Sequence, residues 1–303
     1  MIYLKSFNLP KDTWVDYYFV PINKRREWMR PEDLPEEIDM REPDLRTIHN
    51  SWYPWKTFYN REFTNIEFSD ITILYGSNAS GKTTVLNVIA EKLQLQRTSL
   101  YNKSSFFDEY CYCNGGYTLS DNYKSTDAIR RGKIIVSDDV FKRIHSVREQ
   151  NLNKAIEIEI AANDYLAHDD LPKSLTMSKF IKRTIDHRKR LEMSNGETGF
   201  QYFIENMPDE ALVLLDEPEN SLSAEWQVSL AHEIYNLATR GGCQLVIATH
   251  SPFILSLPDA KIYNLDTTPV QPAKWYELDN MRAYYNLFNM HRSSFETENN
   301  NTK

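Results

Sequence analysis

One short segment limits what this chain can fold into more than any other feature. Residues 76–83 read Gly-Ser-Asn-Ala-Ser-Gly-Lys-Thr, the complete G-x-x-x-x-G-K-[ST] pattern of a phosphate-binding loop. Its glycines let the backbone wrap around an anion, while Lys82 is expected to reach the β- and γ-phosphates and Thr83 to bind Mg²⁺. An apolar, β-branched run at 71–75 precedes the loop, and apolar residues at helical spacing follow it over 84–93. Strand, loop and helix N-terminus in this order predict a nucleotide-phosphate site in an α/β fold.

Composition excludes several classes of protein. The 303 residues, 41% of them apolar, suffice for one large α/β domain or two smaller ones. A formal net charge of −8 argues against a protein that coats nucleic acid through overall basicity. Three cysteines make no disulfide framework, so we expect a cytoplasmic protein, and Cys111-Tyr-Cys113 lacks the second pair of a metal clip. No apolar run approaches the roughly 20 residues of a membrane span, so no membrane insertion is expected.

The alternation of apolar strands and amphipathic helices predicts a mostly parallel sheet with helices on its faces. Strands are expected at 63–68, 70–75, 133–136, 211–215 and 244–249. Helices are expected at 84–93, at 224–238 with a stop at Gly241-Gly242, and over most of 141–191. The polar stretch 97–131 is expected to be a long loop or a small exposed insertion, and 292–303 a frayed polar tail.

Two carboxylates follow another apolar strand. Asp216 and Glu217 come directly after residues 212–215, at the carboxyl end of the strand, where ligands bind in open α/β sheets. Asp216 suits a water-mediated contact to Mg²⁺, and Glu217 lies where a general base could activate an attacking water. The alternative is a solvated acidic turn, which the phosphate loop upstream disfavours.

Two further motifs allow both a structural and a functional interpretation. His250 follows the strand at 245–249, where it can hydrogen-bond a γ-phosphate or serve only as a strand-end histidine. Ser194 or Asn195 can cap the helix that follows, with Glu197 completing a capping-box pattern. The same serine and bare backbone amides at a helix N-terminus also make an anion site.

In their order along the chain, these motifs resemble those of ATP-binding-cassette (ABC) ATPases of the soluble RecF/SMC/OLD-like class, often labelled AAA family ATPases in bacteria. The order is phosphate loop, signature at Ser194–Glu197, Asp216-Glu217-Pro218, a D-loop at Glu219–Leu222, and His250. The resemblance covers residues 63–95 and 190–265. It implies an α/β P-loop NTPase fold, an ABC-ATPase-like mostly parallel sheet flanked by helices, with a β-rich N-terminal part and a helical insertion lobe. The implied organisation is one domain, 1–303, with a nucleotide-binding core at 1–96 and 192–270, an insertion at 97–191, and a C-terminal element and tail at 271–303.

The resemblance also implies an ATP-hydrolysing enzyme with ATP and Mg²⁺ as ligands. The implied nucleotide-binding residues of one subunit are Gly76, Ser77, Asn78, Ala79, Ser80, Gly81, Lys82, Thr83 and Thr84, and the implied metal ligands are Thr83 and Asp216. Ser194 and Gly196 of a second subunit would close over the γ-phosphate, and Ser221 would link the two sites of a head-to-tail homodimer. Glu217, His250 and Lys82 would be the catalytic residues.

The chain departs from the family pattern in three places. The signature reads Ser-Asn-Gly-Glu rather than Ser-Gly-Gly-Gln or Ser-Gly-Gly-Glu, and Ala79 occupies a position that is often glycine. No glutamine stands at 137–139, where the family places a magnesium-contacting one. Asp138 there is open to two interpretations, a water-mediated contact to Mg²⁺ or a cap of the following helix. No adenine-stacking residue is assigned.

Three functions compete on the sequence alone. The first is an ATPase that drives or regulates a protein effector in anti-phage defence or DNA maintenance. The second is the nucleotide-binding subunit of an ABC membrane transporter, which the D-loop, the missing glutamine and the insertion disfavour. The third is a scaffold that binds ATP without hydrolysing it, which Glu217 disfavours. A basic block at 179–190 would contact nucleic acid, or is a solvated face or the site of an acidic protein partner.

Overall fold

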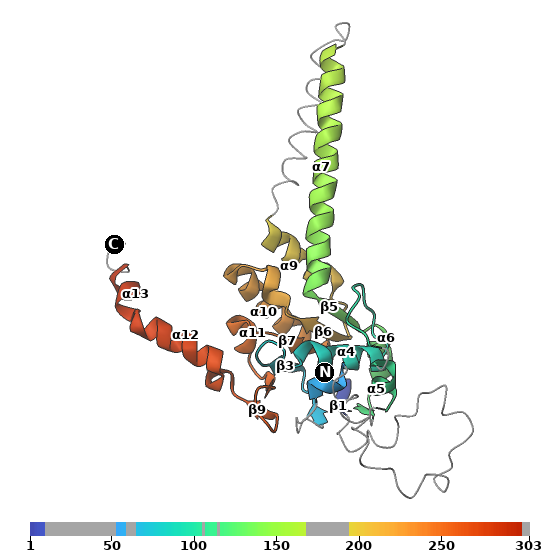
Figure 1. Ribbon diagram of the computed structural model, residues 1–303, viewed down its shortest axis with the longest axis vertical. Helices are drawn as coiled ribbons and strands as arrows, with labels where there is room; N and C mark the ends of the chain where they lie inside the picture. The colour runs from blue at the N-terminus through green and yellow to red at the C-terminus, as the bar shows by residue number, and fades with distance from the viewer. Residues whose placement is uncertain (10–52, 59–64, 105–106, 114–115, 168–193, 299–303) are drawn as a thin grey trace, which may run out of the picture.

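The computed structural model describes residues 1–9, 53–58, 65–104, 107–113, 116–167 and 194–298 (Figure 1). Nine strands in these ranges form two sheets. The larger sheet has the order β5-β6-β7-β3-β8-β9, and the smaller antiparallel sheet has the order β2-β1-β4. The strands are β1 (Leu4–Asn8), β2 (Asn65–Glu67), β3 (Ile71–Tyr75), β4 (Tyr117–Leu119), β5 (Lys133–Val136), β6 (Leu212–Asp216), β7 (Gln244–Ala248), β8 (Lys261–Asn264) and β9 (Gln271–Ala273).

The larger sheet is parallel except for the edge strand β9, which confirms the predicted α/β fold. Strand β3 lies between β7 and β8, and β6 lies between β5 and β7. Every residue of β3, β6 and β7 is buried. Continuous apolar runs are what a parallel strand covered on both faces requires, so these three strands were also the easiest to predict.

Alternate strand residues point into two separate hydrophobic clusters, one on each face of the sheet. Leu212 and Leu214 of β6 contribute to one cluster, and Val213 and Leu215 to the other. The first face is covered by α4 (Lys82–Lys92), α5 (Phe107–Cys113), α6 (Ser125–Arg130) and the smaller sheet. The second face is covered by the base of α7 (Ser137–Ala167), α9 (Asn195–Asn206), α10 (Ala224–Thr239) and α11 (Pro252–Leu255). Three short helical segments complete this part of the fold: α3 (Trp55–Phe58), η3 (Pro218–Ser221) and η4 (Trp275–Glu277).

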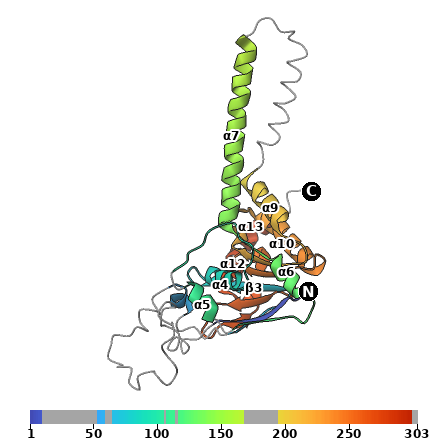
Figure 2. The same cartoon turned by 90° about the vertical axis from the view of Figure 1, so that its right-hand side faces the viewer.

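Two helical projections leave this layered body. Helix α7 is 31 residues long and extends far beyond the sheet, as Figures 1 and 2 show. Helices α12 (Asp279–Met290) and α13 (Arg292–Glu298) extend on another side, where Phe288 and Phe295 are exposed. None of the helices in the described ranges combines the length and the apolar character of a membrane-crossing segment.

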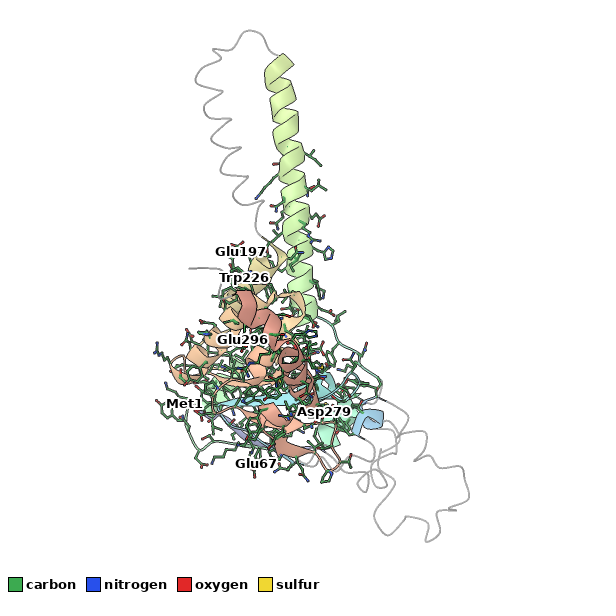
Figure 3. All side chains as sticks on the ribbon, turned by 90° about the vertical axis from the view of Figure 1, so that its left-hand side faces the viewer. Met1, Glu67, Glu197, Trp226, Asp279 and Glu296 are labelled. Atoms are coloured by element: carbon green, nitrogen blue, oxygen red, sulfur yellow. The ribbon has the colours of Figure 1, made fainter. Side chains whose placement is uncertain are left out.

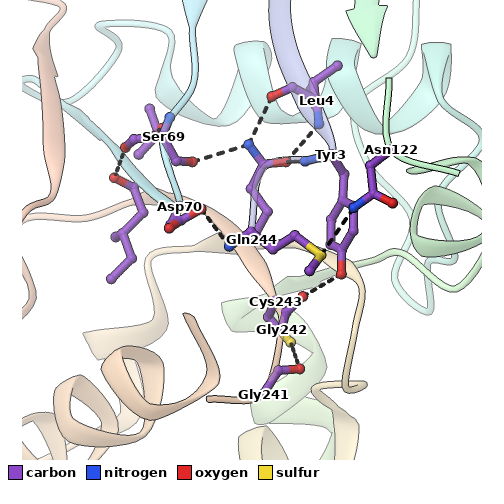
Figure 4. Close-up of polar contacts among 12 residues, drawn as sticks. Tyr3, Leu4, Ser69, Asp70, Asn122, Gly241, Gly242, Cys243 and Gln244 are labelled. Atoms are coloured by element: carbon purple, nitrogen blue, oxygen red, sulfur yellow. Dashed lines mark hydrogen bonds and ion pairs between the residues drawn. The ribbon is translucent and has the colours of Figure 1, made fainter. Parts of the chain in front are cut away.

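One buried side chain joins the two sheets. The Gln244 amide oxygen accepts hydrogen bonds from the backbone N–H groups of Tyr3 (2.9 Å) and Leu4 (2.8 Å). Its amide nitrogen donates to the backbone carbonyls of Leu4 (2.9 Å) and Ser69 (3.1 Å), as Figure 4 shows. All four hydrogen-bonding positions of the amide are therefore used, which offsets the cost of burying it at the start of a core strand.

Two predictions about irregular segments were wrong. The stretch 97–131 contains α5, β4 and α6, and the Phe107 and Tyr110 side chains of α5 are fully buried. Their spacing of three residues places both on one helix face, but the polar residues around them hide this pattern. The segment 292–303 is not simply a frayed tail, because α13 occupies Arg292–Glu298. The predicted basic block at 179–190 lies outside the described residues.

Candidate active site

The phosphate loop connects β3 to α4, as predicted. Gly81 precedes the helix with φ +102°, in the left-handed region that glycine adopts without strain. A Cβ atom at this position would lie 2.5 Å from Thr57 Cγ2, so α3 packs directly against the loop. Ala79 also has a positive φ, +65°, in the middle of the loop. The loop is therefore folded tightly enough that its amides can converge on an anion.

Lys82 is buried within the loop itself. Its Nζ donates to the carbonyl oxygens of Gly76 (2.7 Å) and Ser77 (3.2 Å), and it lies 4.0 Å from Glu217 Oε1. Burial lowers the pKa of the Lys82 ammonium, whereas the nearby carboxylates of Glu217 and Asp216 act in the opposite direction. The ammonium is thus hydrogen-bonded to two loop carbonyls, and from this position it can turn towards a phosphate.

Thr83 and Asp216, the two predicted metal ligands, are in direct contact. The Thr83 hydroxyl donates to Asp216 Oδ1 at 3.0 Å, which joins the start of α4 to the end of β6. Burial raises the pKa of Asp216 to about 7, against the opposing effect of the Thr83 hydrogen bond. Among the described residues no group of three or more His, Cys, Asp or Glu could hold a metal by itself. A hydroxyl and one carboxylate fit Mg²⁺, which prefers oxygen ligands and keeps water and substrate phosphate oxygens in its shell.

Glu217 lies at the junction between β6 and η3. Its φ of +47° and ψ of +54° are left-handed, an uncommon conformation for a glutamate, and its N–H donates to Ala248 O of β7 at 2.8 Å. Asn220 Nδ2 donates to Glu217 Oε2 at 2.9 Å. The other oxygen, Oε1, lies 4.0 Å from both Lys82 Nζ and His250 Nε2. Asn220 therefore holds Oε2 in place, and Oε1 faces Lys82 and His250.

His250 follows β7 and is held by its backbone and its ring. Its N–H donates to Glu219 Oε1 at 2.5 Å, and its ring contacts Tyr75 edge-on with centroids 6.0 Å apart. Burial, followed by the charge of Lys82, lowers the pKa of His250 from 6.5, so the ring is neutral at neutral pH. The His250 Nε2 and Ser221 Oγ atoms are buried and find no hydrogen-bond partner within the described part of the chain.

The signature segment lies at the start of α9. Ser194 is the N-cap, and its Oγ accepts the Glu197 N–H at 3.1 Å, which confirms the capping interpretation. Ser194 is exposed, and Figure 3 shows Glu197 and Trp226 beside the base of α7. Gly196 packs against Trp226 of α10, because a Cβ atom there would lie 2.7 Å from Trp226 Cδ1. Within the described residues, no hydrogen bond joins Ser194 to the phosphate loop of its own chain.

We expect Gly196→Ala to lower stability, because the new methyl group must displace Trp226. Overpacking of this kind costs about 1–3 kcal/mol of unfolding free energy, measurable by urea denaturation. Combining it with Trp226→Ala removes the whole indole that the methyl group meets, so the double variant should lose less than the two single variants together. Strictly additive losses would show that the contact with Trp226 is not what requires glycine.

The two acidic residues at the start of α7 have different surroundings. Asp138 is exposed, whereas Asp139 is buried. Asp139 Oδ2 accepts the Val136 N–H at 3.0 Å, and its Oδ1 accepts the Ser99 hydroxyl at 2.5 Å. The hydrogen bond to the residue before the helix therefore comes from Asp139, whereas one of the two open interpretations placed a cap at Asp138. No described contact supports Asp138 as a magnesium contact.

Sequence reasoning missed one residue at the phosphate loop altogether. Asp266 follows β8, and its carboxylate accepts hydrogen bonds from the N–H and the hydroxyl of Ser77. The signal that could have found it is the parallel pairing of β8 with β3, since the two residues lie at equal distances beyond paired strand ends. That pairing is not visible before the strand order is known.

Comparison with known proteins agrees with this geometry. The family described as ABC transporter matches residues 63–220, and the family described as AAA domain, putative AbiEii toxin, Type IV TA system, matches residues 201–256. No curated protein matches the sequence significantly.

Three solved structures with low similarity illustrate the comparison. The ATP-binding cassette MJ0796 bound to ADP and Pi, described as dimeric and post-hydrolysis, has 16% identity and a TM-score of 0.37, covering 72% of this chain and 91% of that one. The dimeric MJ0796, described as a bacterial ABC transporter cassette, has 14% identity, the same coverages and a TM-score of 0.38. A nucleotide-free ATP-binding cassette from an ABC transporter has 16% identity, coverages of 69% and 83%, and a TM-score of 0.36.

The match to the ABC transporter family spans just over half of the 303 residues and includes both the phosphate loop and the Asp216-Glu217 pair. ABC ATPases bind ATP together with Mg²⁺, and the oxygen ligands of Thr83 and Asp216 suit that ion. The chain therefore belongs to the ABC family of ATP-binding domains and is an ATP-hydrolysing enzyme.

Proposed function

We propose that this ATPase works as a head-to-tail homodimer with ATP held between the phosphate loop of one subunit and the Ser194–Gly196 segment of the other. The observation that carries the proposal is an incomplete site: His250 Nε2 and Ser221 Oγ are buried without a described partner, while Ser194 is exposed at a helix N-terminus. A helix N-terminus attracts anions, and the site of its own chain does not use this one.

Each residue of the site has its own proposed role during hydrolysis. Lys82 leaves the carbonyls of Gly76 and Ser77 and binds the β- and γ-phosphates. Glu217 Oε1 accepts a proton from the attacking water, because Oε2 is already engaged by Asn220. Neutral His250 donates from Nε2 to a γ-phosphate oxygen as charge develops there. Thr83 and Asp216 would hold Mg²⁺, which would supply positive charge to the phosphate oxygens.

A mixing experiment tests the shared site. Lys82→Ala removes the cis half, and Ser194→Asp removes the trans half by placing a carboxylate against the γ-phosphate while preserving a good N-cap. Each variant alone should be inactive, and their mixture should regain activity from the one intact site in each mixed dimer. Phosphate release from the purified variants and from the equimolar mixture measures this.

The matched control mixes Lys82→Ala with Glu217→Gln. Both changes affect the cis half, so each mixed dimer has one damaged residue in each site and no activity should return. Recovery in the control as well, or none in the Lys82→Ala and Ser194→Asp mixture, would contradict the shared site. A dimer that closes around ATP and opens after hydrolysis would then have no support.

The cycle is proposed to drive or regulate a protein effector in bacterial defence or DNA maintenance. Support comes from the AAA domain family matching residues 201–256, whose description names a toxin of a toxin–antitoxin system. Nucleic acid as a partner rests on the basic block at 179–190 and stays a prediction. The transporter alternative draws on the name of the ABC transporter family, and co-purification with a membrane permease would favour it.

A further inference from the structure

The ends of two paired parallel strands bring a carboxylate to the phosphate loop. Strand β8 pairs with β3 so that Asn264 lies opposite Tyr75, the last residue of each strand. Two residues further along each chain segment are Asp266 and Ser77. Asp266 Oδ1 lies 2.9 Å from the Ser77 N and 2.7 Å from its Oγ, and Oδ2 lies 2.7 Å from the same N. One side chain thus accepts both hydrogen-bond donors of Ser77.

A local turn at Asn264 directs the Asp266 side chain towards the phosphate loop. The Asp266 N–H donates to the Asn264 side-chain oxygen at 3.0 Å, and the Thr267 hydroxyl donates to the Asn264 carbonyl at 3.0 Å. The Leu265 N–H donates to Tyr75 O at 2.7 Å and continues the ladder between the strands. Asparagine forms local turns of this type readily. Asp266 is exposed, yet the three hydrogen bonds of residues 265–267 fix the backbone around it.

Both backbone polar groups of Ser77, its N–H and its carbonyl oxygen, have side-chain partners. Asp266 binds its N–H and hydroxyl, while Lys82 Nζ binds its carbonyl oxygen at 3.2 Å. The proposed movement of Lys82 to the phosphates would break the carbonyl contact and leave the contacts to Asp266. Hydrogen bonds with an ionised donor or acceptor are roughly twice as strong as neutral ones, so the carboxylate of Asp266 leaves Ser77 with a charge-assisted anchor after the charge-assisted contact to Lys82 is lost.

We propose that Asp266 is a positioning residue for nucleotide binding, which keeps the first turn of the phosphate loop in its binding conformation while Lys82 engages ATP. The proposal rests on the phosphate loop being the ATP site. The carboxylate of Asp266 accepts the N–H and the hydroxyl of Ser77, so its loss should weaken ATP binding through the loop and leave the chemical step little changed. Its carboxylate acts only through Ser77.

Steady-state hydrolysis and direct ATP binding test this role together. Asp266→Ala should raise KM for ATP about tenfold, the effect of losing one charge-assisted anchor, while kcat changes less than about twofold. Asp266→Asn should recover part of the affinity, because its amide oxygen still accepts one hydrogen bond. Ser77→Ala should weaken binding in the wild-type background and have almost no further effect in Asp266→Ala. Circular dichroism checks that each variant is folded.

Asp121→Asn is the matched control, since this exposed carboxylate pairs only with Lys5 on the smaller sheet among the described residues. Its KM should equal that of the wild type. Wild-type ATP binding by folded Asp266→Ala, or a fall in kcat at unchanged KM, would overturn the proposal. If Lys82→Ala binds ATP as tightly as the wild type, the loop is not the nucleotide site, and the proposed function fails together with this inference.

Discussion

Glu217→Gln is expected to stop turnover while the protein still binds ATP. Glutamine keeps the size of the side chain and an oxygen for Asn220 Nδ2, and both residues have a Cβ, so the left-handed backbone is strained equally in the two proteins. What is lost is the basic carboxylate, and removing a general base typically lowers the rate by about 10²–10⁴-fold. Single-turnover hydrolysis and equilibrium binding of ATP separate the two effects.

The same variant should accumulate the ATP-bound dimer, because the step that opens it is blocked. Light scattering after size-exclusion chromatography, with and without ATP, reports this shift in mass. Glu67→Gln is the matched control, since it removes a 3.3 Å surface ion pair with Lys261 that contributes little. Hydrolysis at the wild-type rate would exclude Glu217 as the base, and loss of ATP binding would give it a structural role instead.

Asp216→Asn is expected to change activity and stability in opposite directions. The neutral amide oxygen is a weaker ligand of Mg²⁺ than a carboxylate, so ATP hydrolysis should fall about a hundredfold. In magnesium-free buffer at pH 8, however, the variant should unfold at higher urea concentration than the wild type. Burying an uncompensated carboxylate is unfavourable, and the neutral amide still accepts the Thr83 hydroxyl.

The pH dependence of this difference follows from the raised pKa. The folded protein holds the Asp216 proton up to a pKa of about 7, whereas the ordinary value is 3.8. Protonated Asp216 therefore stabilises the fold below the ordinary value, and this contribution is lost as the pH rises to about 7. The advantage of Asp216→Asn should grow across that window, reach on the order of 2–4 kcal/mol, and shrink on addition of Mg²⁺. An advantage independent of pH would contradict the buried charge as its cause.

Much of the fold could be predicted because its strands are buried on both faces. β3, β6 and β7 appear as uninterrupted apolar runs, and the loop and carboxylates at their ends follow from the position of ligands in parallel sheets. The helix α5 escaped prediction because its core contacts come from two aromatic residues in polar surroundings. Local composition does not reveal which side of such a segment meets the sheet.

The parts of the candidate site that could not be predicted depend on contacts between distant segments. Ser77 and Asp266 are brought together by the pairing of β3 with β8, and Gly196 needs its small size because α10 places Trp226 beside it. Neither Asp266 nor Trp226 belongs to a local motif. The sequence identifies groups whose chemistry resides in the motif itself, such as Lys82 and Glu217, while the residues that hold them in place appear only after the elements have been arranged.

The four hydrogen bonds of Gln244 also set the order in which the protein can be completed during synthesis. Tyr3 and Leu4 leave the ribosome before Gln244, whose amide binds them and follows 241 and 240 positions later. At a translation rate of about 5–20 residues per second, the backbone groups of Tyr3 and Leu4 that bind Gln244 wait on the order of tens of seconds for this side chain, whereas β2 and β4, the strand partners of β1, are made sooner. During that interval the groups at the start of β1 that bind Gln244 are available to other chains, so slowing translation between β4 and β7 should increase aggregation of the nascent protein.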